Sequence, residues 1–341
     1  MEGPFELTPE NAQAYLIDRG VISPRAETAV EALGWGISNI VLKVVADGDA
    51  LVVKQSLPKL RVKDDWPFDR DRIFIERDCM ELLGGLLPEG SVPVVRFSDD
   101  ENYVFGMSHA PPGGVLWKQA LLDGQVDLDA AIHTGRLLAD IHTLTARHEG
   151  ARARFAGVTN FIQGRVDPYH LTAARANPHL AGIVEAEVDR MLGVRITLVH
   201  GDYSPKNLFV YPDRVYLLDF EVAHIGDPAF DTAFLLNHLI LKSIRRPDLQ
   251  EAYLSAAERF WREYIGRVDL GVPYDVEAAT VRELGCLLLA RIDGKSKIEY
   301  LTDKETRGFA RDLARTILVG TATRIEPVLA DVGASIGAVR R

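Results

Sequence analysis

The segment from Val199 to Glu221 holds the side chains best suited to chemistry in this chain of 341 residues. Asp202 stands in it first, Asn207 follows five residues later, and Asp219 comes twelve residues after Asn207. A carboxylate can accept the proton of an attacking hydroxyl, and carboxylate and amide oxygens are ligands that Mg²⁺ prefers. The spacing predicts phosphoryl transfer from ATP, with Asp202 as the base and Asn207 and Asp219 as magnesium ligands.

Short apolar runs must position these side chains. Residues 196–199 and 208–210 are predicted strands on either side of the loop, and 215–218 is the strand that delivers Asp219. Alternate residues of an extended segment face the same way, so Glu221 is expected in or next to the metal site, with a surface carboxylate as the alternative.

Two further residues are expected to support this loop. His200 is predicted to pack below it and to hydrogen-bond the backbone. Asp231, on the substrate side, is predicted to cap its own helix and to brace the loop.

The N-terminal part of the chain reads as three antiparallel strands, 28–33, 40–45 and 50–54, with a tight turn at Asp47-Gly48. The turn between the first two strands holds candidate nucleotide-binding residues, because glycine permits close approach of the backbone to phosphates. These candidates are Gly34, Gly36, Ser38 and Asn39.

Lys54, at the end of a valine-rich strand, is predicted to reach the α- and β-phosphates. Its expected ion-pair partner is Glu76 in the helical run 72–83, with Asp78 and Glu81 as competitors.

A connection between two lobes is expected after the predicted strands 92–97 and 103–107, because Pro and Gly follow them. Met107, Ser108 and His109 would lie beside adenine there, although Met107 could equally be plain core. The predicted lobes are 1–108 and 109–341. Helices are expected in the second lobe at 129–144, 232–243, 249–265, 276–292 and 303–323, with a frayed tail from 333 to 341.

The motifs together resemble those of the aminoglycoside phosphotransferase and choline kinase superfamily. They are His200-Gly201-Asp202, Asn207, Asp219-Phe220-Glu221 and Gly226-Asp227-Pro228 with Asp231, and the resemblance runs from about Ala29 to about Leu301. It implies an α+β, bilobal protein-kinase-like fold, with an antiparallel-sheet N-lobe and a mainly helical C-lobe. It also implies ATP and Mg²⁺ as cofactors.

Only eleven residues separate Asp219 from Asp231, too few for the segment with which a protein kinase holds a peptide. The acceptor is therefore expected to be a small molecule that carries a hydroxyl.

The N-lobe run from Val52 to Glu76 is similar to that of methylthioribose kinases, as is the Asp-x-Glu pattern at 219–221. The similarity makes Trp66 a candidate lid residue, with packing on its own lobe as the alternative. Methylthioribose kinases commonly lack the Asn at 207 and carry paired arginines where this chain has Ala290-Arg291.

Arg291 and Lys295 are the candidates for acceptor binding, because a polar, Gly-containing segment follows an apolar helix there. A sugar-like acceptor is expected, with an aminoglycoside kinase or a catalytically silent pseudokinase as alternatives.

Composition limits the partners. The formal net charge is −10 without a basic tract, which disfavours nucleic acid and anionic membranes. No apolar stretch reaches membrane-spanning length, and the acidic start does not resemble a signal peptide. Two cysteines suit a reducing compartment, so a cytoplasmic monomer or homodimer is expected.

Overall fold

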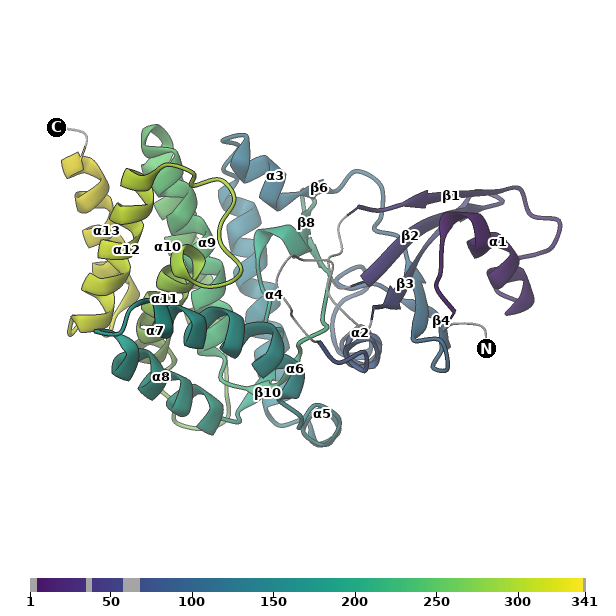
Figure 1. The fold of residues 1–341 in the computed structure, drawn as a ribbon, viewed down its shortest axis with the longest axis horizontal. Coiled ribbons are helices and arrows are strands. Elements are labelled where there is room, and N and C mark those ends of the chain that lie inside the picture. Colours follow the sequence, from purple (N-terminus) through teal and green to yellow (C-terminus); the bar gives the residue numbers. More distant parts are fainter. Residues whose placement is uncertain (1–4, 35–38, 58–67, 340–341) are drawn as a thin grey trace. The chain divides into compact units, whose positions relative to one another are not determined.

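The computed structural model describes residues 5–34, 39–57 and 68–339, and it divides into two compact units. The first unit is Met1–Pro112 with Leu218–Val222, and the second is Gly113–Leu217 with Ala223–Arg341. The first unit holds an antiparallel sheet and the second is mainly helical, which is the expected α+β class (Figure 1). Sequence reasoning placed the division at 108, four residues before the observed one.

Five antiparallel strands form the sheet of the first unit, in the order β1-β2-β3-β5-β4. Their bounds are β1 Thr28–Ala32, β2 Asn39–Ala46, β3 Asp49–Ser56, β4 Val95–Asp99 and β5 Val104–Ser108. Asp47 and Gly48 join β2 to β3 with φ of 50° and 89°, the left-handed geometry that a tight hairpin needs and that Gly adopts readily. This local signal is why the hairpin was predictable.

Successive side chains of β3 point to opposite faces of this sheet. Val53 packs in a core that includes Leu16 of α1 (Pro9–Asp18), while Lys54 pairs with Glu76 of α2 (Arg72–Leu86). Thr8 caps α1 in a capping box, with Pro9 in the first turn of the helix.

Long helices form the core of the second unit (Figure 1). Their bounds are α4 Leu128–Ala146, α8 Ala181–Gly193, α9 Ala229–Arg245, α10 Gln250–Arg267, α11 Val276–Asp293, α12 Lys304–Val319 and α13 Ile325–Val339. Helix α10 packs on α4 and α9, and α11 packs on α9 and α12. The shorter helices are α3 Trp117–Leu122, α5 Glu149–Arg154, α6 Thr159–Phe161 and α7 Thr172–Ala176. A π-helix, η1, spans Ile162–Leu171, and 3₁₀ turns lie at η2 Pro205–Asn207 and η3 Pro247–Leu249.

The expected frayed tail is wrong for the described residues, because α13 continues to Val339 and packs on α10 and α11. The apolar side chains Val332 and Ile336 are buried there. Tertiary packing therefore holds this helix in place near the end of the chain, where fraying is common.

Small sheets carry the motif segment of the second unit. β7 (Thr197–Val199) pairs with β10 (His224–Gly226), and β8 (Leu208–Val210) pairs with β6 (Val115–Leu116) and β9 (Val215–Leu217). The predicted strand–loop–strand arrangement is present, and the loop with Asp202 lies between β7 and β8.

Candidate active site

The Lys54–Glu76 pair is the best-defined polar feature of the first unit. Lys54 Nζ, from β3, donates to both carboxylate oxygens of Glu76, from α2, at 2.7 Å each. Asp219 Oδ1 lies 3.2 Å from the same ammonium. The predicted ion pair between Lys54 and Glu76 is therefore present, and neither Asp78 nor Glu81 replaces Glu76 as the partner of Lys54.

Charge around Lys54 keeps it protonated. Burial alone would lower the pKa of Lys54, but the carboxylates of Glu76, Asp219 and Glu221 outweigh it and raise that pKa above its usual value. Burial raises the pKa of the Glu76 carboxyl, and Lys54 offsets this only in part. A fixed ammonium beside an acidic group suits a triphosphate that arrives with its metal.

Asp219 has an unusual backbone. Its φ is 71°, in the left-handed region that non-Gly residues seldom adopt, and it follows β9 directly after Leu218. Its side chain is 25% exposed, against 10% for that of Glu221. Strain of this kind persists where the surroundings hold a residue in a required orientation.

Glu221 is buried and contacts other residues of the first unit. The alternative prediction, that Glu221 is a surface carboxylate, is therefore wrong. Its Oε2 accepts a hydrogen bond from Asn39 Nδ2 at 3.1 Å and lies 3.4 Å from Arg72 Nε. Asn39 begins β2 instead of standing in the preceding turn, and its amide is buried because it meets this carboxylate. Of the Asp-x-Glu pair, Asp219 is thus the carboxylate that is better placed to meet a cation.

Arg72 contacts both Glu221 and the backbone around it, and sequence reasoning gave this residue no role. Its side chain is fully buried and donates to the carbonyl oxygens of Phe68, Asp69 and Leu57 at 2.7–3.0 Å. Burial lowers the pKa of Arg72, and the Glu221 carboxylate opposes that change. The similarity noted around residues 52–76 was the only signal that pointed to it.

The loop that carries Asp202, in the second unit, is anchored by Asp231 of α9. Its carboxylate accepts from the backbone N–H groups of His200 and Gly201 at 2.7 and 2.8 Å and lies 3.3 Å from His142 Nε2. The predicted brace is therefore present. The predicted helix cap is wrong, because α9 begins after Pro228 with no side-chain cap and the carboxylate turns to the loop instead.

His200 has the supporting position expected for it. It is buried, and its Nδ1 accepts the backbone N–H of Asp202 at 3.0 Å. The ring lies edge-on to Tyr203 at 5.8 Å. A ring nitrogen that accepts this hydrogen bond fixes the loop and is not available as a base.

Asp202 meets two cations of its own unit. Arg165 Nη2 and Lys206 Nζ lie 3.0 and 2.6 Å from Asp202 Oδ2. Asn207 Nδ2 donates to the Asp202 backbone oxygen at 2.9 Å, so the amide oxygen is the atom of Asn207 that can face a metal ion. Sequence reasoning missed Arg165 and Lys206, although Lys206 stands inside the motif itself.

The predicted acceptor residues lie at the end of α11. Arg291 is buried, and its Nη1 donates to Ser296 O, Ser296 Oγ and Tyr169 Oη at 2.5, 2.8 and 3.3 Å. Lys295 is exposed, and its backbone N–H donates to Pro168 O at 2.8 Å.

Tyr169 links Arg291 to the catalytic loop through η1. Arg165 and Arg291 lie 5.6 and 5.8 Å from its ring, and Arg165 pairs with Asp202. Burial would raise the pKa of Tyr169, but Arg291 and Arg165 together lower it below its usual value. The π-helix thus brings Arg291 into one electrostatic cluster with Asp202, and π-helical turns are frequent at functional sites.

The predicted adenine-side residues lie where β5 ends. Met107 is buried between β3 and β4, and the Ser108 N–H donates to Val94 O at 2.8 Å. His109 follows, with its N–H 3.4 Å from Ala50 O.

Of the remaining candidates, Gly34 is an exposed turn residue after β1. Gly36, Ser38 and Trp66 lie outside the described residues.

The Asp219 carboxylate and the Asn207 amide oxygen are each of a donor type that fits Mg²⁺, which binds through one or two protein oxygens with phosphates and water completing its shell. Across residues 5–34, 39–57 and 68–339, no group of three or more His, Cys, Asp or Glu side chains could hold a metal ion.

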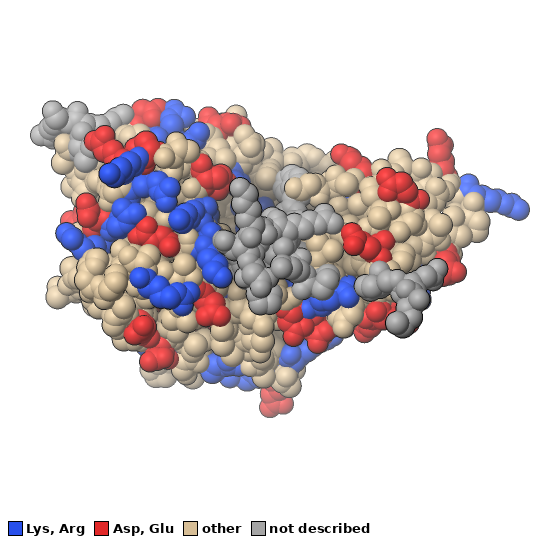
Figure 2. Space-filling model, viewed as in Figure 1, with Lys and Arg blue, Asp and Glu red and all other residues tan. Residues whose placement is uncertain are grey.

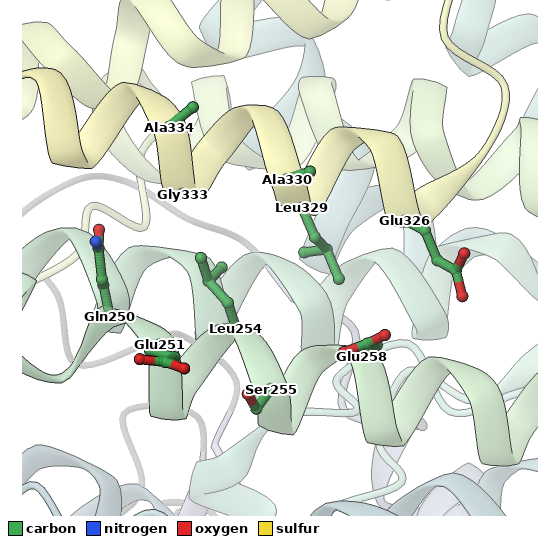
Figure 3. A pocket seen from close by; sticks show the side chains of 10 residues that line it. All are labelled: Gln250, Glu251, Leu254, Ser255, Glu258, Glu326, Leu329, Ala330, Gly333 and Ala334. Atoms are coloured by element: carbon green, nitrogen blue, oxygen red, sulfur yellow. The ribbon is translucent and has the colours of Figure 1, made fainter.

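A groove of about 440 Å³ lies elsewhere in the second unit, between α10 and α13 (Figure 3). Leu254 and Leu329 line it, with the carboxylates of Glu251, Glu258 and Glu326 at its edges. None of the candidate site residues lines this groove, so we assign no part of the active site to it.

Comparison with known proteins places the chain in a family. The sequence matches the family described as "Phosphotransferase enzyme family" over residues 29–270. Methylthioribose kinase of Bacillus thuringiensis (strain Al Hakam) is 24% identical over 363 residues, covering 92% of each chain. A methylthioribose kinase of Bacillus cereus (strain B4264) also matches at 24% identity and 92% coverage of each chain.

Solved structures show the same fold. A choline/ethanolamine kinase family protein from Mesorhizobium loti superposes with a TM-score of 0.56 at 15% identity, covering 95% of this chain and 99% of that one. The GDP and kanamycin complex of APH(2")-IIia gives 0.53 at 17% identity, covering 92% and 100%.

The family match spans most of the chain, so the chain belongs to the phosphotransferase enzyme family. Its fold is the protein-kinase-like one shared by these small-molecule kinases. In the part of the chain that the structure describes, no helix is long and apolar enough to cross a membrane.

Proposed function

We propose that this enzyme transfers the γ-phosphoryl group of ATP to a hydroxyl of a small, sugar-like molecule. The observation that carries the proposal is the buried Lys54–Glu76 ion pair with Asp219 at 3.2 Å. An ammonium fixed by two carboxylates is what a kinase uses to orient the α- and β-phosphates. The intact triad also argues against the pseudokinase alternative.

Asp202 is the proposed base. The acceptor oxygen forms a bond to the γ-phosphorus, the bond from that phosphorus to the β–γ bridging oxygen breaks, and the hydroxyl proton passes to Asp202 as ADP leaves. Lys206 and Arg165 hold the Asp202 carboxylate in one orientation, and Asp231 holds the backbone that carries it.

Asp219 and Asn207 are the proposed magnesium ligands, and this pairing rests on the sequence motif and on their oxygen donors. When bound, the ion neutralises phosphate charge. Glu221 is proposed to support the metal site without binding the ion, by holding the side chains of Asn39 and Arg72 in place. The turn with Gly34, Gly36 and Ser38, which leads into Asn39 at the start of β2, is proposed to cover the phosphates, with Met107, Ser108 and His109 beside adenine.

A sugar-like acceptor is supported by the methylthioribose kinases that match this chain over 92% of their length. Arg291 and Lys295 are proposed to contact it, with Trp66 as a lid. An aminoglycoside is less suitable, because such polycations would meet the positive groups of Arg291, Arg165 and Lys206. Because ATP is the donor, we place the reaction in the cytoplasm. We propose that the enzyme is a monomer or a homodimer.

An acceptor panel tests the proposal. Purified enzyme with ATP and Mg²⁺ is given methylthioribose, other pentoses, amino sugars and aminoglycosides, and ADP release is followed together with the mass of the product. We expect release that depends on a sugar-like acceptor. Phosphorylation of kanamycin with no sugar accepted would support an antibiotic kinase, and nucleotide binding without any turnover would support a pseudokinase.

A further inference from the structure

Lys242 is a buried lysine for which the described part of the chain supplies no acidic partner. It lies on α9 and is 1% exposed. Its Nζ makes long contacts to His238 O at 3.4 Å and Tyr300 Oη at 3.5 Å, and it lies 5.2 Å from the centre of the Tyr300 ring. Within the described ranges no carboxylate lies at ion-pair distance from it, although buried charges in proteins are normally paired.

Further positive groups surround Lys242. Burial, then the charges of Lys118, Arg291 and Arg245, lower its pKa to about 7, and the charge of Glu299 opposes them. Glu299 is itself engaged, because Lys118 Nζ lies 2.5 Å from its carboxylate. The environment therefore has an excess of cations, which is unfavourable unless an anion joins them.

This cationic region continues to the catalytic loop. Phe234, His238 and Lys242 follow each other at four-residue spacing, so they share one face of α9. The ring centres of Phe234 and His238 lie 5.3 Å apart, and the Arg165 guanidinium carbon lies 5.9 Å from the centre of the Phe234 ring. Arg165 in turn pairs with Asp202, so the face of α9 that ends in Lys242 starts beside the partner of the proposed base.

Positive side chains also gather outside this region. Figure 2 shows Lys and Arg, with acidic side chains among them, on the part of the second unit that holds α12 and the segment leading into it. That segment carries Lys295 and Tyr300. Tyr300 is only partly exposed, and its hydroxyl lies 3.5 Å from Lys242 Nζ.

We propose that the acceptor carries an anionic oxygen group, a carboxylate or a phosphate, which Lys242 and Arg291 bind while the acceptor hydroxyl meets Asp202. The proposal rests on the proposed function, because it describes the substrate of that reaction. It narrows a sugar-like acceptor to a sugar acid or a sugar phosphate. One anion would supply the partner that Lys242 lacks among the described residues.

Binding without nucleotide tests the proposal separately from catalysis. Isothermal titration of the full chain in a chloride buffer at pH 6.5 would compare ribose, ribonate and ribose 5-phosphate. We expect at least one of the two anions to bind ten-fold or more tightly than ribose, and the better of them tells carboxylate from phosphate. Lys242→Met should remove that preference, since it keeps the length of the side chain and removes the charge.

Lys304→Met is the matched control, because Lys304 is an exposed lysine at the start of α12 and its loss changes the net charge equally. It should keep the wild-type preference. Equal binding of ribose and both anions, no binding of either anion, or an unchanged preference in Lys242→Met would overturn the proposal. Anion binding that depends on Lys242, without phosphoryl transfer to any acceptor, would overturn the proposed function and leave the anion site standing.

Discussion

Replacing Lys242 by Met should make the protein more stable, by an amount that falls as the pH rises. The ordinary pKa of a lysine is 10.5, and in the fold that of Lys242 is about 7. This difference corresponds to a cost of up to roughly 5 kcal/mol for keeping the ammonium buried at low pH. Met packs in the same volume without that cost.

The sign follows from proton binding. Between pH 7 and 10.5 the folded Lys242 is mostly neutral while the unfolded chain still holds the proton, so its contribution to stability improves as pH rises. Below pH 7 both states are protonated and the whole cost is present. The advantage of Lys242→Met is therefore largest near pH 6.5 and shrinks by about 1 kcal/mol for each pH unit up to 9.5.

Three groups near Lys242 have pKa values that are shifted away from this window. Burial raises the pKa of Tyr300, and the ion pair with Lys118 outweighs burial and lowers the pKa of Glu299. Burial and the nearby cations lower the pKa of His238 far below its usual value. The other charged neighbours are Lys118, Arg245 and Arg291.

The assay is urea unfolding of both proteins at pH 6.5, 7.5, 8.5 and 9.5, with Lys304→Met as the control that removes an exposed ammonium. The unfolding free energy of the control should change with pH in the same way as that of the wild type. A difference between Lys242→Met and the wild type that stays constant across these pH values, or a variant less stable than the wild type at pH 6.5, would refute the reasoning.

Four further variants test candidate residues of the two units. Asp231→Asn should cost about 2–4 kcal/mol in urea unfolding, because it weakens two charge-assisted hydrogen bonds to the catalytic loop, and should lower kcat with little change in the KM for ATP. Asp219→Ala should abolish the magnesium dependence of nucleotide affinity, and Glu221→Ala should reduce it less; equal, small effects in a magnesium titration would remove this pair from the site. Glu76→Gln should weaken ATP binding about ten-fold, because Lys54 loses one of its carboxylates, and calorimetry that shows unchanged affinity would contradict this.

Much of the first unit could be predicted because its signals are local. The hairpin at Asp47-Gly48, the cap at Thr8 and the strands around Lys54 each depend on neighbouring residues. The Lys54–Glu76 pair joins separate elements, but the strand and helix periodicities put both side chains on the surfaces that face each other.

What could not be predicted depends on contacts between distant segments. Arg165 reaches Asp202 from a π-helix, whose geometry no simple periodicity indicates. Lys242 belongs to a helix that is buried almost all round, so its position in the sequence does not reveal that its ammonium is enclosed. Asp231 was expected to cap its helix, but the carboxylate has two stronger partners in the loop backbone.

The most direct test of the central claim is the rate of phosphoryl transfer in a single turnover with Asp202→Asn. The acceptor is one that the wild type phosphorylates, and the donor is ATP labelled at the γ-phosphate. The substitution keeps the size of the side chain and removes its proton acceptor, so we predict a fall of roughly 10²–10⁴-fold with nucleotide affinity retained. A rate within a few-fold of the wild type would show that Asp202 is not the base.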